Sequence, residues 1–292
     1  MIRVLLAFLV AGSGFAQSLA EGVSAIEAGR LDEAERILSA VVTAQPDSAD
    51  ANFYLGLARF RADRPAEARP LLERAVKLSP DNGAAWKTLG LVTLSGGDME
   101  GALPALGKAC ELIPKDPEAC YYFARDLHAL GRYEAARDPF ERALRASPKK
   151  MLPRVHRAAA LNFAAMGLPQ EAERNFLKAI QLNDRRTHDA EDPRVDYGAF
   201  LFRQGRTEEA LHPLEQAARD APSARVYVEW GRVLLHLDRL NDAVACLEKA
   251  VSLEPGNWNS HLLLGRAYLR LGKSSEGDRE MRLGQEGWAG KK

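Results

Sequence analysis

The sequence predicts an all-α protein, a right-handed solenoid of about eight repeated helix-turn-helix units. Alanines recur at intervals of about 34 residues, small residues recur twelve places before them, and prolines recur twelve places after them. Between these markers apolar residues are spaced by three and four places, as in Phe123, Leu127 and Leu130, which is typical of one face of an α-helix. One helix pair cannot bury its apolar face alone, so neighbouring pairs must stack.

The composition excludes several classes of protein. The 292 residues include 40 basic and 40 acidic side chains, and 46% of them are hydrophobic. A dedicated nucleic-acid-binding protein would carry a basic excess, and a disordered chain would be poorer in apolar residues. Three cysteines are too few for a disulfide-rich scaffold, and their spacing fits no zinc finger.

The N-terminus has the layout of a secretory signal. Met1–Arg3 supplies a positive charge, Val4–Ala11 is an unbroken apolar run, and small residues lead to Ala16. The apolar run is shorter than the roughly 20 residues that span a bilayer, which disfavours an uncleaved anchor. We therefore expect a signal peptide at residues 1–16, cleavage after Ala16, and an exported chain that is periplasmic or secreted.

Small residues mark the crossing point of the two helices in each repeat. They let the backbones approach closely, because a larger side chain would push the helices apart. On the second helix the series is Ala34, Ala68, Ala102, Ala136, Ala172, Ala210, Ala243 and Gly277. Twelve places earlier, on the first helix, stand Gly22, Gly56, Gly90, Ala124, Ala160, Gly198, Gly231 and Gly265.

The helix ends are marked as regularly. Seven places past the first small residue, a glycine can adopt the left-handed conformation that ends a helix. Acidic residues then open the second helix, where the helix dipole favours negative charge, and proline closes the repeat. The helix-ending residues are Gly29, Asp63, Gly97, Gly131, Gly167, Gly205, Asp238 and Gly272, and the closing residues are Pro46, Pro80, Pro114, Pro148, Asp184, Pro222 and Pro255.

This pattern resembles the tetratricopeptide repeat, whose helix-turn-helix units of about 34 residues carry these small residues and this closing proline. The resemblance covers essentially all of residues 17–292. It implies repeats at about 17–48, 49–82, 83–116, 117–150, 153–186, 191–223, 224–257 and 258–291, the last being a polar cap. Extra residues near Lys149 and within 183–190 shift the register, and the second shift predicts a bend or looser packing between the fifth and sixth repeats.

No motif indicates catalysis or metal binding. His188 and its acidic neighbours form a charged linker, and a metal site needs several convergent ligands, so we expect a solvated loop there. Cys120 and His128 are about 12 Å apart along one helix, too far to act as nucleophile and base. We expect no enzyme activity, no metal and no cofactor.

The cysteines offer one sharper hypothesis. Cys110 and Cys120 flank the turn at Pro114, which folds two helices back on each other. In an exported protein they are candidates for a disulfide, provided that their Cα atoms come within about 7 Å. Two packed free thiols are the alternative. Cys246 has no evident partner.

The resemblance also implies a binding surface. In tetratricopeptide repeat proteins the second, fifth, ninth, twelfth and thirteenth residues of each repeat line a concave groove that takes peptides. Arg266 also occupies a ninth place, and the family's carboxylate clamp is not supported, because Leu91 follows Lys87 where the clamp has asparagine. The groove candidates in this chain are Phe53, Lys87, Tyr121, Arg125, His128, Arg157, Phe202 and Arg232.

A basic centre of this groove is expected from five of the candidates. Tyr121, Arg125 and His128 share one helical face, and Lys87 and Arg157 extend it on either side. The alternative is that several of these residues simply pack between repeats.

Together these features predict an exported protein-protein interaction scaffold that binds a partner protein or an extended, acidic peptide in its groove. We expect no nucleic-acid partner and no stable membrane span after signal cleavage. Two alternatives stay open: an envelope enzyme or accessory subunit that recognises glycan or peptidoglycan, and a solenoid that mainly self-associates.

Overall fold

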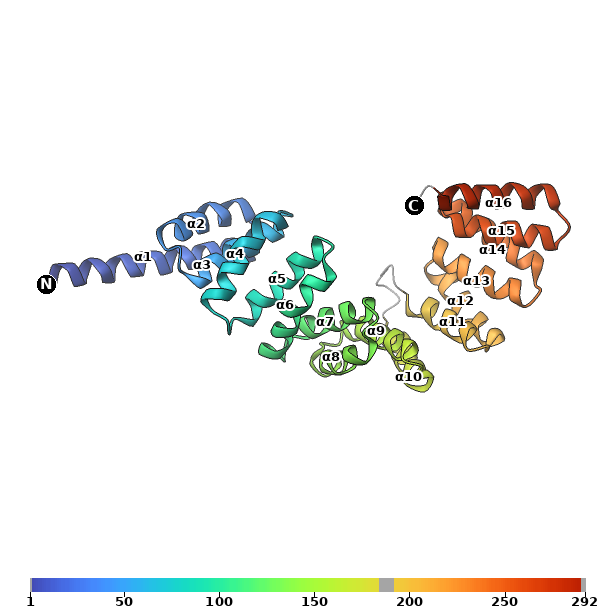
Figure 1. Cartoon of the computed structure of the whole chain (residues 1–292), viewed down its shortest axis with the longest axis horizontal. Helices are drawn as coiled ribbons and strands as arrows, with labels where there is room; N and C mark the ends of the chain where they lie inside the picture. The colour runs from blue at the N-terminus through green and yellow to red at the C-terminus, as the bar shows by residue number, and fades with distance from the viewer. Residues whose placement is uncertain (1, 184–191, 290–292) are drawn as a thin grey trace. The chain divides into compact units, whose positions relative to one another are not determined.

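The computed structural model describes residues 2–183 and 192–289, with side chains from Phe15 onward (Figure 1). The described residues form sixteen α-helices, which confirms the predicted all-α class. The predicted register shift at 183–190, the proline substitute Asp184 and the His188 loop fall largely or wholly outside these residues. The helices are α1 (Ile2–Glu27), α2 (Leu31–Ala44), α3 (Ala49–Arg61), α4 (Pro65–Leu78), α5 (Gly83–Ser95), α6 (Met99–Leu112), α7 (Pro117–Ala129), α8 (Tyr133–Ala146), α9 (Leu152–Ala165), α10 (Pro169–Leu182), α11 (Pro193–Arg203), α12 (Thr207–Asp220), α13 (Ala224–His236), α14 (Leu240–Leu253), α15 (Trp258–Arg270) and α16 (Ser274–Ala289).

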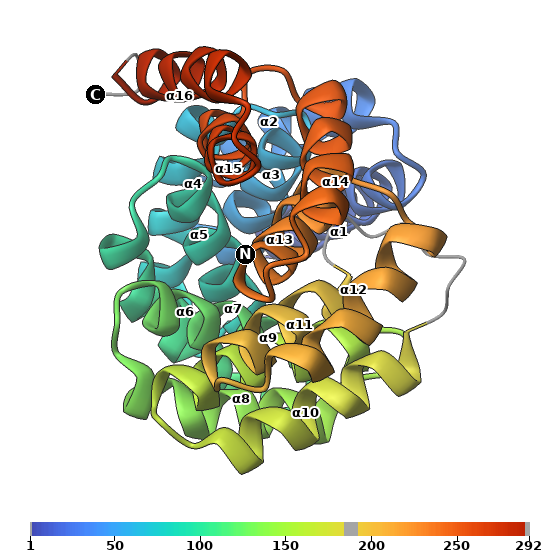
Figure 2. The same cartoon turned by 90° about the vertical axis from the view of Figure 1, so that its right-hand side faces the viewer.

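Consecutive helices pack in pairs, from α1 with α2 to α15 with α16. Figures 1 and 2 both show α15 and α16 side by side. Each pair is one helix-turn-helix repeat, so the described residues contain the eight predicted repeats. The chain forms two compact units, Met1–Pro148 and Lys149–Lys292, called here the N-terminal and C-terminal units.

Within each unit most first helices of successive repeats contact one another. In the N-terminal unit α1 contacts α3 and α3 contacts α5, and in the C-terminal unit α9 contacts α11, α11 contacts α13 and α13 contacts α15. Among the described helices, no two second helices of neighbouring repeats make a comparable contact. Elements on the inner side of a curved stack lie closer together than those on the outer side. The first helices therefore form the concave side of each unit.

The first helices end as the sequence predicts. All eight residues predicted to end them have a positive φ, including the two that are not glycine, Asp63 and Asp238 at 59°. The glycines range from 72° at Gly29 to 82° at Gly97. Left-handed backbone at this point reverses the chain and lets the second helix fold back on the first.

The small residues of the first helix make room for one large residue of the second. A Cβ atom built on Gly90 would lie 2.6 Å from Cγ of Leu106, far inside van der Waals contact. In two repeats the first-helix position holds alanine, and the large residue of the second helix is then a phenylalanine, Phe140 or Phe176, fully buried. The same collision occurs for Gly22 with Leu38, Gly56 with Leu72, Gly198 with Leu214 and Gly231 with Leu247.

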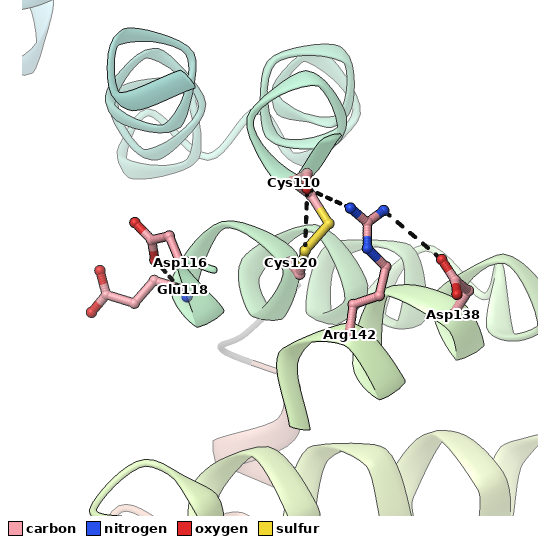
Figure 3. The surroundings of a disulfide bond; sticks show 6 residues. All are labelled: Cys110, Asp116, Glu118, Cys120, Asp138 and Arg142. Atoms are coloured by element: carbon pink, nitrogen blue, oxygen red, sulfur yellow. Dashed lines mark hydrogen bonds and ion pairs between the residues drawn. A yellow bond between two sulfur atoms is a disulfide. The ribbon is translucent and has the colours of Figure 1, made fainter. Parts of the chain in front are cut away.

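Cys110 at the end of α6 and Cys120 at the start of α7 form a disulfide, with their Cα atoms 4.6 Å apart (Figure 3). Arg142 of α8 donates a hydrogen bond from Nη2 to the carbonyl oxygen of Cys110 at 2.7 Å. The disulfide therefore links the third repeat to the fourth. The hydrogen bond from Arg142 adds a second link between these repeats, from α8 to the end of α6. Cys246, the third cysteine, is free and buried.

Helix α1 runs through Ala16, after which the sequence predicts cleavage, and its later part packs against α2 as the first helix of repeat one. Ala25 and Ile26 of this part are buried together with Leu38 of α2. Within the described residues, no helix has the length and hydrophobicity that crossing a membrane requires.

Candidate functional site

A cavity of about 460 Å³ opens on the first helices of the C-terminal unit. It spans three repeats, because α11, α13 and α15 all contribute to its walls. We call it the C-terminal groove. Its lining residues are Phe202, Arg232, Leu235, His236, Leu263, Arg266, Leu269 and Arg270.

The floor of the C-terminal groove is apolar. Leu235 and Leu263 are buried, whereas Leu269 keeps 40% of its surface exposed. The ring of Phe202 meets the ring of His236 edge to face, with centroids 5.3 Å apart. A leucine with this much exposure beside two buried leucines leaves apolar surface for a ligand to cover.

The rim of the groove is basic. Nη1 of Arg232 lies 3.3 Å from a carboxylate oxygen of Glu229. Arg270 donates to the carbonyl oxygen of Leu235 at 2.6 Å and to the carboxylate of Asp238 at 2.7 Å. Arg266 is exposed and makes no ion pair with any residue that the structure describes. One guanidinium of the rim is thus available to an anionic ligand without displacing an internal partner.

Arg157, a predicted groove residue, is engaged inside the C-terminal unit. Its guanidinium donates to the carboxylate of Asp196, a residue of α11 that is 5% exposed. Arg225 of α13 donates to the other oxygen of the same carboxylate. Three successive first helices are joined through this one acid, so Arg157 positions the helices and its charge is already matched.

Lys87 is engaged in the N-terminal unit in the same way. Its Nζ lies 2.5 Å from Asp116, the residue that caps the start of α7, and 3.3 Å from Glu118 in the first turn of α7. Burial lowers the pKa of Lys87, but the hydrogen bond and the charges of the two acids outweigh it, and the pKa is raised overall. Lys87 therefore stays protonated and joins repeats three and four.

Two aromatic candidates lie in the interior rather than on a groove surface. Phe53 is 7% exposed and packs with Leu72 and Leu89, and Tyr121 is 4% exposed against Tyr122. The reason is that the fifth place of the first helix faces the next repeat, where a large apolar ring is covered.

Arg125 and His128 remain at the surface of the N-terminal unit. The guanidinium of Arg125 stacks over the ring of Tyr122, 4.9 Å from its centroid, and lies 3.6 Å from Asp126. His128 packs against the ring of Tyr133. Burial raises the pKa of Asp126 and outweighs the opposing effect of Arg125.

The five residues of the predicted basic centre are divided between the two units, so the centre as a whole stays a prediction. Arg157 belongs to the C-terminal unit and the other four to the N-terminal unit. Lys87 and Arg157 carry charges that internal acids already match, and Tyr121 is buried. Of the predicted groove residues, the structure brings Phe202 and Arg232 together in one cavity.

Sequence reasoning left six lining residues of the C-terminal groove out of the candidate set. The sequence does contain a signal for Arg266, because Arg266 and the candidate Arg232 stand at the ninth place of consecutive repeats. A second signal is a leucine at the twelfth place followed by a basic residue at the thirteenth, which occurs in the same two repeats as Leu235 with His236 and as Leu269 with Arg270. The omitted residues are Leu235, His236, Leu263, Arg266, Leu269 and Arg270.

Known proteins are similar to parts of this chain. One curated relative is the type IV pilus assembly protein PilF of Pseudomonas aeruginosa, 30% identical over 128 residues, which are 42% of this chain and 48% of PilF. The chain thus spans about half the length of that relative. A solved structure of MamA AMB-1 is 31% identical, with a TM-score of 0.51 over 57% of this chain and 98% of MamA.

A third comparison concerns the fold alone. A tetratricopeptide repeat protein from Parabacteroides merdae is 21% identical, with a TM-score of 0.60 over 87% of this chain and 99% of that protein. Tetratricopeptide repeat profiles match residues 19–82, 56–117 and 228–276, and a further one matches 117–142. Repeat spacing, helix pairing and these matches agree, and the chain belongs to the tetratricopeptide repeat family.

Proposed function

We propose that this chain is an exported protein-interaction scaffold that binds an extended segment of a partner protein in its C-terminal groove. The observation that carries the proposal is the apolar cavity on α11, α13 and α15, whose floor keeps Leu269 exposed and whose rim holds Arg232 and Arg266. Cavities with an apolar floor and a few polar groups at the edge are typical of binding sites.

Export is supported by two independent features. The segment 1–16 has the composition of a cleavable signal. The disulfide between Cys110 and Cys120 belongs to an oxidising compartment, because cytosolic thiols are kept reduced. The resemblance to a type IV pilus assembly protein supports a role in pilus assembly.

Affinity capture of the tagged chain tests the scaffold role. Leu269→Asp places a charge on the groove floor, and Leu177→Asp is the matched control, because Leu177 is 49% exposed on α10, a second helix of the same unit. A partner that the native chain and L177D capture, and that L269D loses while its helical content is unchanged, supports the proposal. Equal capture by all three chains contradicts it.

Export is tested separately by cell fractionation and N-terminal sequencing. The expected product lies outside the cytoplasm and begins at Gln17. A full-length chain that stays in the cytoplasm would contradict export while leaving the groove untouched.

A further inference from the structure

The charge of the C-terminal groove identifies the chemistry of its ligand, an inference that rests on the proposed function. The eight lining residues include three arginines and one histidine, and none of them is an acid. The chain as a whole has equal numbers of acidic and basic residues, so this surface departs from the average. Such a local excess attracts carboxylates.

Two of these arginines stand in the same register. Arg232 and Arg266 occupy the ninth place of consecutive repeats, on α13 and α15, which contact each other. Packed helix axes lie roughly 8–10 Å apart, so the bases of these two side chains are separated by about that distance. An extended peptide advances about 3.3 Å per residue. The spacing corresponds to about three residues of an extended ligand.

Apolar side chains line the same groove as Arg232 and Arg266. Leu235 and Leu263 form the covered part of the floor, Leu269 forms its exposed part, and the half-buried ring of Phe202 also lines the groove. A polar side chain placed there would lose water without gaining a hydrogen bond. The ligand residue between the two carboxylates must therefore be large and apolar.

We propose that the C-terminal groove takes an extended peptide segment in which two carboxylates stand about three residues apart and flank a bulky apolar side chain. Arg266 pairs with one carboxylate without breaking any internal ion pair of the described residues, and Arg232 exchanges Glu229 for the other. Guanidinium-carboxylate pairs of this kind are planar and bidentate, which fixes the register of the segment. Arg270 keeps its bonds to Leu235 and Asp238 and shapes the wall.

A fatty acid also combines a carboxylate with apolar surface, but it offers a single carboxylate. Two arginines at equivalent places of neighbouring repeats match a ligand that is itself periodic, which a peptide is. The peptide is therefore the assigned occupant, and dodecanoate serves as the competing probe in the test.

The test is selection from a display library of random octapeptides on the full-length native chain. The expected outcome is enrichment of peptides with Asp or Glu at two places about three apart and Phe, Leu, Met or Trp between them. Enrichment of basic or uncharged peptides would overturn the proposed ligand chemistry and leave the scaffold role standing. A library that yields no binder, or dodecanoate that binds and displaces selected peptides, would overturn the peptide as occupant.

Variants connect the selected peptide to the groove. Arg266→Glu is expected to weaken binding by at least about tenfold, a change easily resolved in a titration. Arg174→Glu is the matched control, because Arg174 is exposed on α10 and its side chain changes charge by the same amount. The assignment of the acidic peptide to the groove would be overturned if both variants weakened binding equally or if neither weakened it. It would also be overturned if the affinity did not fall with added salt.

The outcomes separate this inference from the proposed function. One outcome is that the native chain captures a partner that L269D loses, while the library selects no acidic residues. That outcome supports the scaffold role and contradicts the acidic ligand. If substitutions in the groove abolish the binding of neither the partner nor the peptide, both the proposed function and the proposed ligand are wrong.

Discussion

At the residue scale, single backbone positions decide where each helix ends. Gly131 has a φ of +74°, and nothing lies within 4 Å of a Cβ built on it, so a substitution there meets backbone strain and no steric clash. We predict that Gly131→Ala destabilises the fold by about 1 kcal/mol, because alanine is strained in the left-handed region. The measurement is the shift of the urea midpoint of unfolding.

Gly256→Ala is the control for that prediction. Gly256 also has open space around it, but its φ lies outside the left-handed range. There the substitution reduces the entropy of the unfolded chain, and the midpoint should stay or rise slightly. A similar loss in both variants would show that the left-handed conformation is not what Gly131 supplies.

The cysteines give a second prediction at this scale. Unreduced protein unfolded in denaturant should show one reactive thiol, that of Cys246, because Cys110 and Cys120 are bonded. In the native chain that thiol should react slowly, since burial raises the pKa of Cys246 to about 11. Reduction, or the double change of Cys110 and Cys120 to serine, should cost roughly 2–3 kcal/mol of stability. Three thiols in unreduced protein would refute the bond.

At this scale the sequence predicts the helix ends but not the contacts between repeats. The positions with left-handed backbone follow from the repeat register, because that requirement is local. Lys87 and Arg157 could not be recognised as internally paired, because their acids lie 29 and 39 residues away and meet them only after the repeats stack. The register alone assigns Phe53 to the groove, whereas the stacking of the next repeat buries it.

At the scale of elements, the contact between a glycine and a leucine sets the distance between the two helices of a repeat. Gly90→Ala should destabilise the fold by about 1–3 kcal/mol, because the new methyl group overlaps the buried side chain of Leu106. Adding Leu106→Phe should recover part of the loss, since Ala124 and Phe140 hold these two places in the next repeat. Urea unfolding of the single and double variants measures the coupling. Simple addition of the two losses would refute this packing rule.

Ion pairs between neighbouring repeats make the stack sensitive to acid. Glu173 of α10 accepts hydrogen bonds from Arg206 and from the hydroxyl of Tyr197 in the next repeat. The bond from Arg206, opposed by burial, holds the pKa of Glu173 below its usual 4.5. Because the folded pKa is lowered, the stabilisation is present above about 4.5 and is lost as pH falls through the folded value.

The corresponding prediction uses Glu173→Gln. This variant should lose less stability than the native chain between neutral pH and a pH about one unit below 4.5. Glu208→Gln, which alters an exposed acid of α12, should follow the native acid profile. Matching profiles for the native chain and the Glu173 variant would contradict the role of this ion pair.

At the scale of the whole molecule, the repeat count and helix pairing could be predicted because the pattern recurs at a nearly constant period and each copy checks the others. The division into two compact units could not be predicted, because it depends on contacts between repeats rather than on any one repeat. The cavity of the C-terminal groove could be predicted only in part. All of its lining residues except Leu263 stand at family groove positions, but only the packing of α11, α13 and α15 shows which of those positions remain open.

The central claim is that the C-terminal groove contacts a partner protein in the cell. The most direct measurement replaces one residue with a photo-crosslinking amino acid in living cells. His236 is the test position, because it is exposed and lines the groove, and His212 is the control, because it is exposed on α12 of the same unit. The account predicts a defined crosslinked protein from position 236, none from 212, and loss of the product when Arg266→Glu is added. The same products from both positions, or a product at 236 that persists with Arg266→Glu, would contradict it.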